Sequence, residues 1–96
     1  MSAASTRAGG RQPAAESCAF LREHIVHKRE IPNGMDFLFM GPAMEIHDAL
    51  KQWVSVEQAE NGFLQFDFAK IDDCYLLRVA GAAKYRQRIR AYFKNR

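Results

Sequence analysis

Residues 31–42 read IPNGMDFLFMGP, an apolar run held between two turn signals. Pro32-Asn33-Gly34 is typical of a tight turn, because proline and Asn-Gly favour the backbone angles that reverse a chain. Gly41-Pro42 ends the run, and proline is well tolerated in the first turn of a helix. The stretch therefore predicts a strand over residues 35–40 that follows a turn and leads directly into a helix.

The residues before this turn fit two kinds of secondary structure. One helical face would contain Cys18, Leu21 and Ile25, with Ser17 as the N-cap. Ile25-Val26 and Ile31, in contrast, are β-branched and favour a strand. We expect a short helix that gives way near His24 to a strand ending at Ile31, and this strand would form a hairpin with residues 35–40. Whether residues 17–30 are helix or strand stays open at this stage.

After Pro42 the apolar residues recur with the period of a helix. The pattern predicts an amphipathic helix to about Gln58, and Asn61-Gly62 is a typical C-terminal stop. Its apolar positions are Ala43, Ile46, Ala49, Leu50, Trp53 and Val54.

The second half of the chain repeats this order of elements. Residues 63–69 alternate between apolar and polar side chains, residues 70–73 predict a turn, and residues 74–80 predict the returning strand. Gly81 interrupts the pattern, and residues 82–94 predict a last helix. The apolar arc of this helix consists of Tyr85, Ile89, Tyr92 and Phe93.

Together these elements predict an α+β fold of the ββαββα type. We expect a four-stranded antiparallel sheet with two helices packed on one face, preceded by an N-terminal segment that starts as a short helix. The other sheet face would also carry apolar side chains, so we expect a second copy, another protein or the N-terminal segment to cover it. The candidates for that face are Met35, Leu38, Met40, Cys74 and Leu76.

The first sixteen residues differ in composition from the rest. Alanine, serine, glycine and proline dominate them, so we expect residues 1–16 to be a disordered tail and residues 17–96 to be a single α+β domain. Gly9-Gly10 and Pro13 predict that no helix forms there. The alternative is a cleavable organelle transit peptide, since Arg7 and Arg11 precede the first acidic residue.

Three segments of the chain resemble a group of small, uncharacterised bacterial proteins. The segments are residues 29–34 (REIPNG), 57–66 (EQAENGFLQF) and 76–81 (LLRVAG), and the resemblance extends over residues 29–93. In that group a Glu-x-x-Cys-Cys-Pro-Phe segment connects the first helix to the second hairpin. Here residues 60–62 read Glu-Asn-Gly in place of the adjacent cysteines. The resemblance therefore implies the fold and implies no activity, thiol site or metal site.

Charge divides the chain at Asp73. Seven of the fourteen Lys and Arg residues follow it, whereas all eleven Asp and Glu residues lie at or before it. Such an excess of positive charge attracts anions. We therefore predict a partner-binding surface on the last strand and last helix, made of Arg78, Lys84, Arg86, Arg88, Arg90 and Lys94. Basic side chains that only border a buried face are the alternative interpretation.

Other function classes have weaker support. No apolar run reaches the roughly 18 residues that a membrane span needs, so we expect a soluble protein without a membrane partner. Two cysteines without a C-x-x-C pair favour a reducing cytoplasm. No phosphate-binding loop, zinc motif or catalytic triad pattern is present in the sequence, so we predict no enzyme, no cofactor and no metal site.

The sequence therefore predicts a non-enzymatic binding or regulatory module. Its basic C-terminal helix would contact an anionic partner, either an acidic protein or a nucleic acid, and the open sheet face would support a homo-oligomer. The alternative is a small thiol- or metal-handling protein that uses Cys18, Cys74 and the three histidines His24, His27 and His47.

Overall fold

The computed structural model of the chain describes residues 12–94. Its elements, in chain order, are α2 (Gln12–His24), β1 (Ile25–Ile31), β2 (Gly34–Phe39), α3 (Ala43–Glu60), β3 (Gln65–Ile71), β4 (Cys74–Ala80), the short 3-10 helix η1 (Ala83–Tyr85) and α4 (Arg86–Arg90). The transit-peptide alternative and most of the predicted tail fall on residues 1–11, which lie outside the described residues.

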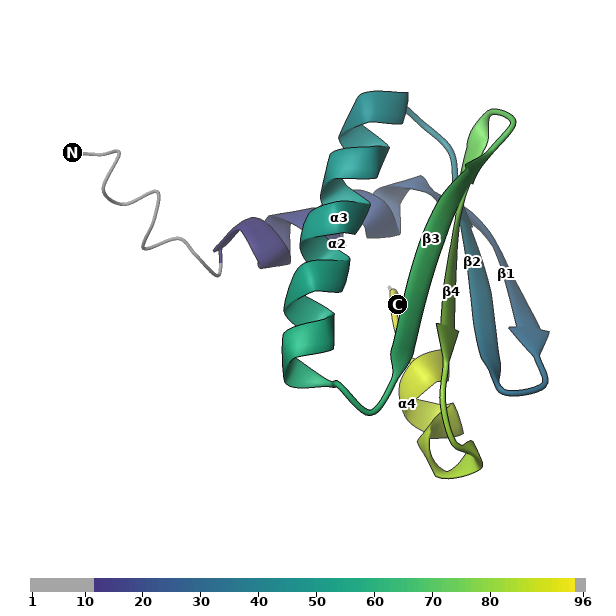
Figure 1. The fold of residues 1–96 in the computed structure, drawn as a ribbon. Helices are drawn as coiled ribbons and strands as arrows, with labels where there is room; N and C mark the ends of the chain where they lie inside the picture. The colour runs from purple at the N-terminus through teal and green to yellow at the C-terminus, as the bar shows by residue number, and fades with distance from the viewer. Residues whose placement is uncertain (1–11, 95–96) are drawn as a thin grey trace.

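The four strands form one antiparallel sheet in the order β1-β2-β4-β3. Each hairpin contributes one edge strand and one central strand, and β2 pairs with β4 in the middle. Figure 1 shows α2 and α3 on the same side of this sheet. The predicted fold class, a small α+β fold with a four-stranded antiparallel sheet, is confirmed.

The core lies between the sheet and the helices. Alternation along the strands directs Phe37 and Phe39 of β2 and Leu77 and Val79 of β4 toward the helices, where all four are fully buried. Helix α3 buries five of the six predicted apolar positions, and the sixth, Ala43, is exposed. The five are Ile46, Ala49, Leu50, Trp53 and Val54. Trp53 packs edge-on against Phe66 and at a tilt against Phe93. Aromatic contacts therefore join α3, β3 and the C-terminal segment.

Helix α2 begins earlier than the sequence predicted. It starts at Gln12, so the expectation that Pro13 excludes a helix was wrong. Proline lacks a backbone N–H, but the N–H groups of the first turn make no hydrogen bond within the helix, so proline is tolerated there. Ser17 is not the N-cap but lies inside the helix, where its buried hydroxyl donates to Gln52 of α3 at 3.3 Å. The predicted change from helix to strand after His24 is confirmed.

The last helix is shorter than predicted. The expected helix over residues 82–94 is instead η1 followed by the five-residue α4 and a series of turns. Phe93 has a φ of 58°, in the left-handed region, and its ring contacts the buried rings of Phe37 and Phe39 edge-on. The chain leaves the helical path here so that the Phe93 ring is buried in the core. A regular helix would instead continue past the sheet.

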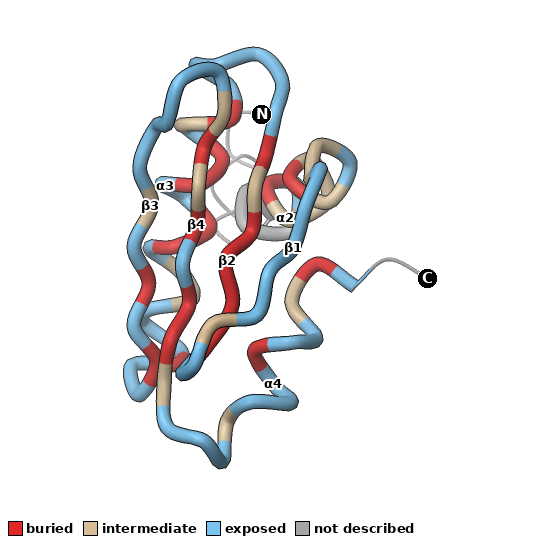
Figure 2. Tube along the Cα trace, turned by 90° about the vertical axis from the view of Figure 1, so that its right-hand side faces the viewer, coloured by how far each residue is buried: buried red, intermediate tan, exposed pale blue. Residues whose placement is uncertain are grey.

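The two strands of the first hairpin differ in exposure. Figure 2 shows β2 largely buried and β1 largely exposed along its length, as expected for a central strand beside an edge strand. On the open face Leu38, Cys74 and Leu76 are half-buried and Met40 is exposed. Of the candidates for this face, Met35 does not lie there, because alternation turns it to the helix side with 8% exposure. Covering of this face by a second copy stays a prediction.

The connections shift by two residues in places. Helix α3 continues to Glu60 and ends where the backbone N–H of Asn61 donates to the Glu57 carbonyl. Strand β3 begins at Gln65 rather than Phe63, so Phe63 belongs to the loop after α3. No helix among residues 12–94 is long and apolar enough to cross a membrane.

Candidate functional site

The structure distributes the six predicted partner-binding residues over three places. Arg78 lies on the open sheet face, because its neighbours Leu77 and Val79 point toward the helices. Lys84 belongs to η1, while Arg86, Arg88 and Arg90 belong to α4 and Lys94 follows it. These last five lie with the helices on the covered side of the sheet, since Ile89 and Phe93 between them are buried in the core. Arg78 is therefore separated from the other five by the sheet.

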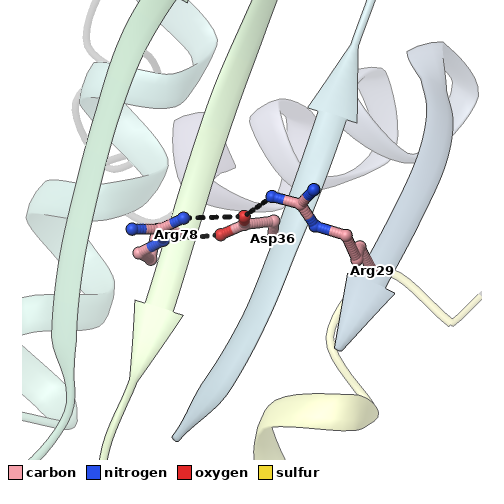
Figure 3. A network of polar contacts seen from close by, with 3 residues as sticks. All are labelled: Arg29, Asp36 and Arg78. Carbon is pink, nitrogen blue, oxygen red and sulfur yellow. Dashed lines mark hydrogen bonds and ion pairs between the residues drawn. The ribbon is translucent and has the colours of Figure 1, made fainter. Parts of the chain in front are cut away.

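Arg78 takes part in an ion-pair network centred on Asp36. Register places Arg29 of β1, Asp36 of β2 and Arg78 of β4 side by side across three strands. Arg78 donates from Nε to Asp36 Oδ1 at 2.7 Å and from Nη2 to Oδ2 at 2.9 Å, and Arg29 donates to Oδ2 at 2.8 Å (Figure 3). The two guanidinium groups leave the Asp36 side chain only 3% exposed, although it lies on the open face.

These contacts change the acid–base properties of the pair. The hydrogen bond from Arg78 is the largest cause that lowers the pKa of Asp36 below its ordinary value of 3.8, and Arg29 lowers it further against the opposing effect of burial. The same hydrogen bond raises the pKa of Arg78. Asp36 is therefore ionised and fully engaged at neutral pH, and Arg78 is held in place by a two-point contact.

On one side of α4, two arginines share one carboxylate of β1. Arg90 Nε lies 2.9 Å from Glu30 Oε2, and Arg86 Nη1 lies 4.0 Å from the same oxygen. Arg86 also donates to the carbonyl of Pro32 at 3.4 Å. All three charged side chains remain more than two-fifths exposed. Glu30 thus holds two guanidinium groups next to each other at the surface and neutralises one of their two charges.

On the other side of α4, two cations border an aromatic stack. The rings of Phe63 and Tyr85 are stacked with centroids 4.4 Å apart and planes at 24°. Arg88 Cζ lies 5.5 Å from the Phe63 centroid, and Lys84 Nζ lies 5.3 Å from the Tyr85 centroid. Both distances lie within the range of cation–π interactions, which extends to about 6 Å. Within residues 12–94 neither cation forms an ion pair with a carboxylate.

A chain of side-chain hydrogen bonds that ends on the Glu57 carboxylate orients Arg88. Its Nη2 donates to Asn61 Oδ1 at 3.1 Å, and Asn61 Nδ2 donates to Glu57 Oε1 at 2.8 Å. The Tyr92 hydroxyl donates to the same Glu57 oxygen at 2.9 Å. Burial, followed by this hydrogen bond to Glu57, raises the pKa of Tyr92. Tyr92 is thereby fixed as a neutral donor and does not face a ligand.

The residues of the thiol or metal alternative are spread over four elements. Cys18 is on α2 and Cys74 is on β4, and both are free and half-buried. His24 Nδ1 lies 2.8 Å from the Phe20 carbonyl oxygen, and His47 lies 3.3 Å from its neighbour Asp48. In the described part of the chain, no three His, Cys, Asp or Glu side chains gather closely enough to hold a metal ion.

One hollow of the surface lies away from the basic residues. A groove of about 880 Å³ lies between α2 and α3, and its charged lining residues are Glu16, Glu45, Asp48 and Lys51. Three carboxylates against one ammonium make this groove unsuitable for an anion. A smaller hollow of about 330 Å³ on the open face is bordered by Arg78 and Asp67 among others, and Arg78 is already paired there with Asp36.

Comparison with known proteins adds no relative. No family model, no curated protein and no solved structure matches this chain. Any inference about the class of protein therefore depends on the fold and the surface alone.

Two residues of these surfaces were missed by sequence reasoning. Asp36 was counted only as a polar residue in an apolar strand, and its alternation with Met35 and Phe37 does place it on the open face. Its partners lie 7 and 42 residues away, so no local pattern joins them. Phe63 was assigned to a strand. The glycine immediately before it is the signal that could have placed it in a loop.

Proposed function

We propose that this protein is a non-enzymatic binding module that contacts an anionic partner through the surface of η1 and α4. This α4 surface consists of Lys84, Arg86, Arg88, Arg90 and Lys94. One observation carries the proposal: the five cations are all exposed, and Glu30 is the only carboxylate of the described chain that forms ion pairs with them. A net excess of positive charge thus remains after internal pairing and can attract an anion.

The scaffold beneath the α4 surface supports a specific contact rather than general attraction. Ile89 and Phe93 have 1% and 4% exposure and anchor the segment in the core. Glu30 and Asn61 orient Arg86, Arg90 and Arg88 from two different elements. Cations held at fixed positions lose less conformational entropy on binding than cations on a loose tail.

The groups at this surface are suited to binding. They are guanidinium and ammonium groups, aromatic rings and one amide, which donate hydrogen bonds and stack on planar ligands. Arg78 is left out of the proposed surface, because its guanidinium is already paired with Asp36 on the opposite face. The proposal therefore narrows the sequence-based set from six residues to five.

Affinity for an immobilised polyanion tests the proposal. We expect wild-type protein to bind heparin with strong salt dependence, because each neutralised anionic group releases counterions. The triple variant Arg86→Gln, Arg88→Gln, Arg90→Gln should elute at markedly lower salt. The matched control is the triple variant Arg22→Gln, Lys51→Gln, Lys70→Gln, which removes the same charge from other elements. Equal losses in the two triple variants, or no binding by wild type, would overturn the proposal.

A further inference from the structure

We infer that the anionic partner is a single-stranded nucleic acid and that one of its bases stacks on Phe63. This inference rests on the proposed function and deepens it, because it names the partner class of the same surface. The site, called here the Phe63 platform, consists of Phe63, Tyr85, Lys84 and Arg88. It shares its two cations with the α4 surface.

The exposure of Phe63 is the first observation. Its side chain is 46% exposed, whereas Phe37, Phe39, Phe66 and Phe93 are all buried in the core. The ring nevertheless has a defined position, since it stacks on Tyr85 at 4.4 Å. A base that arrives at such a ring does not have to order it first, so less of the stacking free energy is lost.

The cations beside the rings are the second observation. Arg88 Cζ lies over the Phe63 ring, 5.5 Å from its centroid and near the outer limit of a cation–π contact, and Phe63 is still 46% exposed. A base that stacks on Phe63 would displace this weak contact and leave the guanidinium beside it. Lys84 Nζ lies over the Tyr85 ring in the same way at 5.3 Å. Their hydrogen-bond and charge capacity is not taken up by a carboxylate among the described residues. Phosphates on either side of a stacked base would find these two cations.

This combination fits a single strand better than the other anionic partners. Non-sequence-specific binding of single-stranded nucleic acid typically combines a basic track with aromatic rings on which bases stack. In a duplex the bases are already stacked and paired, so none would be free to stack on Phe63. An acidic protein would engage the cations and leave the ring without a planar ligand.

The first test uses wild-type protein alone. Fluorescence anisotropy would compare a labelled 12-residue oligothymidylate with an abasic strand that has the same phosphates but no bases. Stacking on one aromatic side chain contributes about 1–3 kcal/mol per base, so we expect the abasic strand to bind on the order of tenfold more weakly. Equal affinity for the two strands would overturn the inference.

The second test uses variants at the ring. Phe63→Leu should weaken oligothymidylate binding on the order of tenfold and leave heparin retention unchanged, because heparin has no bases. Phe63→Tyr keeps the ring and should retain the wild-type affinity. The matched control is Phe68→Leu, which removes a half-buried ring of β3 outside the platform. Circular dichroism checks that each variant is folded.

The outcomes separate this inference from the proposed function. If Phe63→Leu binds the oligonucleotide as wild type does, while the heparin results hold, the stacking inference is wrong and the anionic partner is of another class. A 12-base-pair duplex that binds more tightly than the single strand would overturn it as well. If wild type binds neither heparin nor the oligonucleotide, both the proposed function and this inference fail.

Discussion

Arg78 and Arg88 belong to the same basic stretch of sequence, ten residues apart, yet they lie in two different settings. On the open face, Arg78 makes two hydrogen bonds to a buried carboxylate, at 2.7 and 2.9 Å. On the α4 surface, Arg88 makes one hydrogen bond to a neutral amide at 3.1 Å. The first guanidinium joins three strands through Asp36, whereas the second forms no ion pair with a carboxylate among the described residues. Counting charges along a sequence does not distinguish these two uses.

The largest effect is expected where β2 and β4 approach each other next to the Asp36 network. A Cβ atom at Gly34 would overlap the backbone carbonyl of Val79 and lie 2.8 Å from Ala80 Cα. Gly34→Ala must therefore separate the central strands and should reduce the free energy of unfolding by about 3 kcal/mol. Urea denaturation measures this change. The control is Gly62→Ala, where the added Cβ meets one carbonyl oxygen at 3.5 Å. Similar losses of unfolding free energy in both variants would contradict the close approach of β2 and β4 at Gly34.

A smaller loss is expected when the carboxylate of the network is neutralised. Asp36→Asn keeps the shape of the side chain but removes its charge, and charge-assisted hydrogen bonds typically contribute about 1.5–3 kcal/mol. Because the Arg78 and Arg29 side chains are 49% and 64% exposed, we expect a loss of about 2 kcal/mol. Asp67→Asn is the control, since Asp67 is an exposed residue paired in register with Arg78. A cost of Asp67→Asn as large as that of Asp36→Asn would contradict the special role of the buried carboxylate.

The network should also give the protein a distinct dependence on acid. The pKa of Asp36 is lowered below 3.8 by Arg78 and Arg29, so its stabilising contribution is fully present above that value. The contribution is lost as the pH falls through 3.8 toward the folded pKa. The stability difference between wild type and Asp36→Asn should therefore be constant from pH 7 to about 5 and shrink as the pH falls below 3.8. A difference that persists unchanged at pH 2 would mean that charge is not its cause.

The smallest effect on stability is expected on the α4 surface. Glu30→Gln breaks ion pairs between side chains that are more than two-fifths exposed, and such pairs contribute at most about 1 kcal/mol. The same variant removes the one carboxylate that offsets Arg86 and Arg90, so affinity for heparin should rise. Chemical denaturation and salt elution measure the two effects. Glu60→Gln, an exposed change outside these pairs, is the control. A fall in heparin affinity would contradict the proposed role of the surface.

Much of the fold could be predicted from the sequence because its signals are local. The strand bounds at Ile31 and Ala80 follow from turn residues and alternation, and both agree with the structure. The length of the last helix could not be predicted, because burial of the Phe93 ring among rings from other elements ends the regular pattern. The start of α2 was missed because Pro13 was interpreted as a helix breaker rather than as a first-turn residue.

The candidate site was predicted only in part, because its contacts join residues that are far apart in the sequence. The cations of α4 could be named from composition, but their partners come from β1 and the α3–β3 loop. Arg78 is separated from these cations because its side chain lies on the opposite face of the sheet. The alternation of Leu77 and Val79 in the sequence had indicated this. The stack of Phe63 on Tyr85 joins the loop after α3 to η1, and no periodic pattern connects the two. Long-range contacts therefore decide which charges are free.

The comparison of Arg78→Gln with Arg88→Gln tests the central claim most directly. Each variant removes one positive charge, so total charge is matched, and heparin affinity is measured over a range of salt concentrations. We predict that Arg88→Gln weakens binding and lowers the magnitude of the log–log salt slope by about 1, while Arg78→Gln leaves both unchanged once the protein is shown to be folded. Equal weakening by the two variants would contradict the account, because binding would then depend on total charge rather than on the α4 surface.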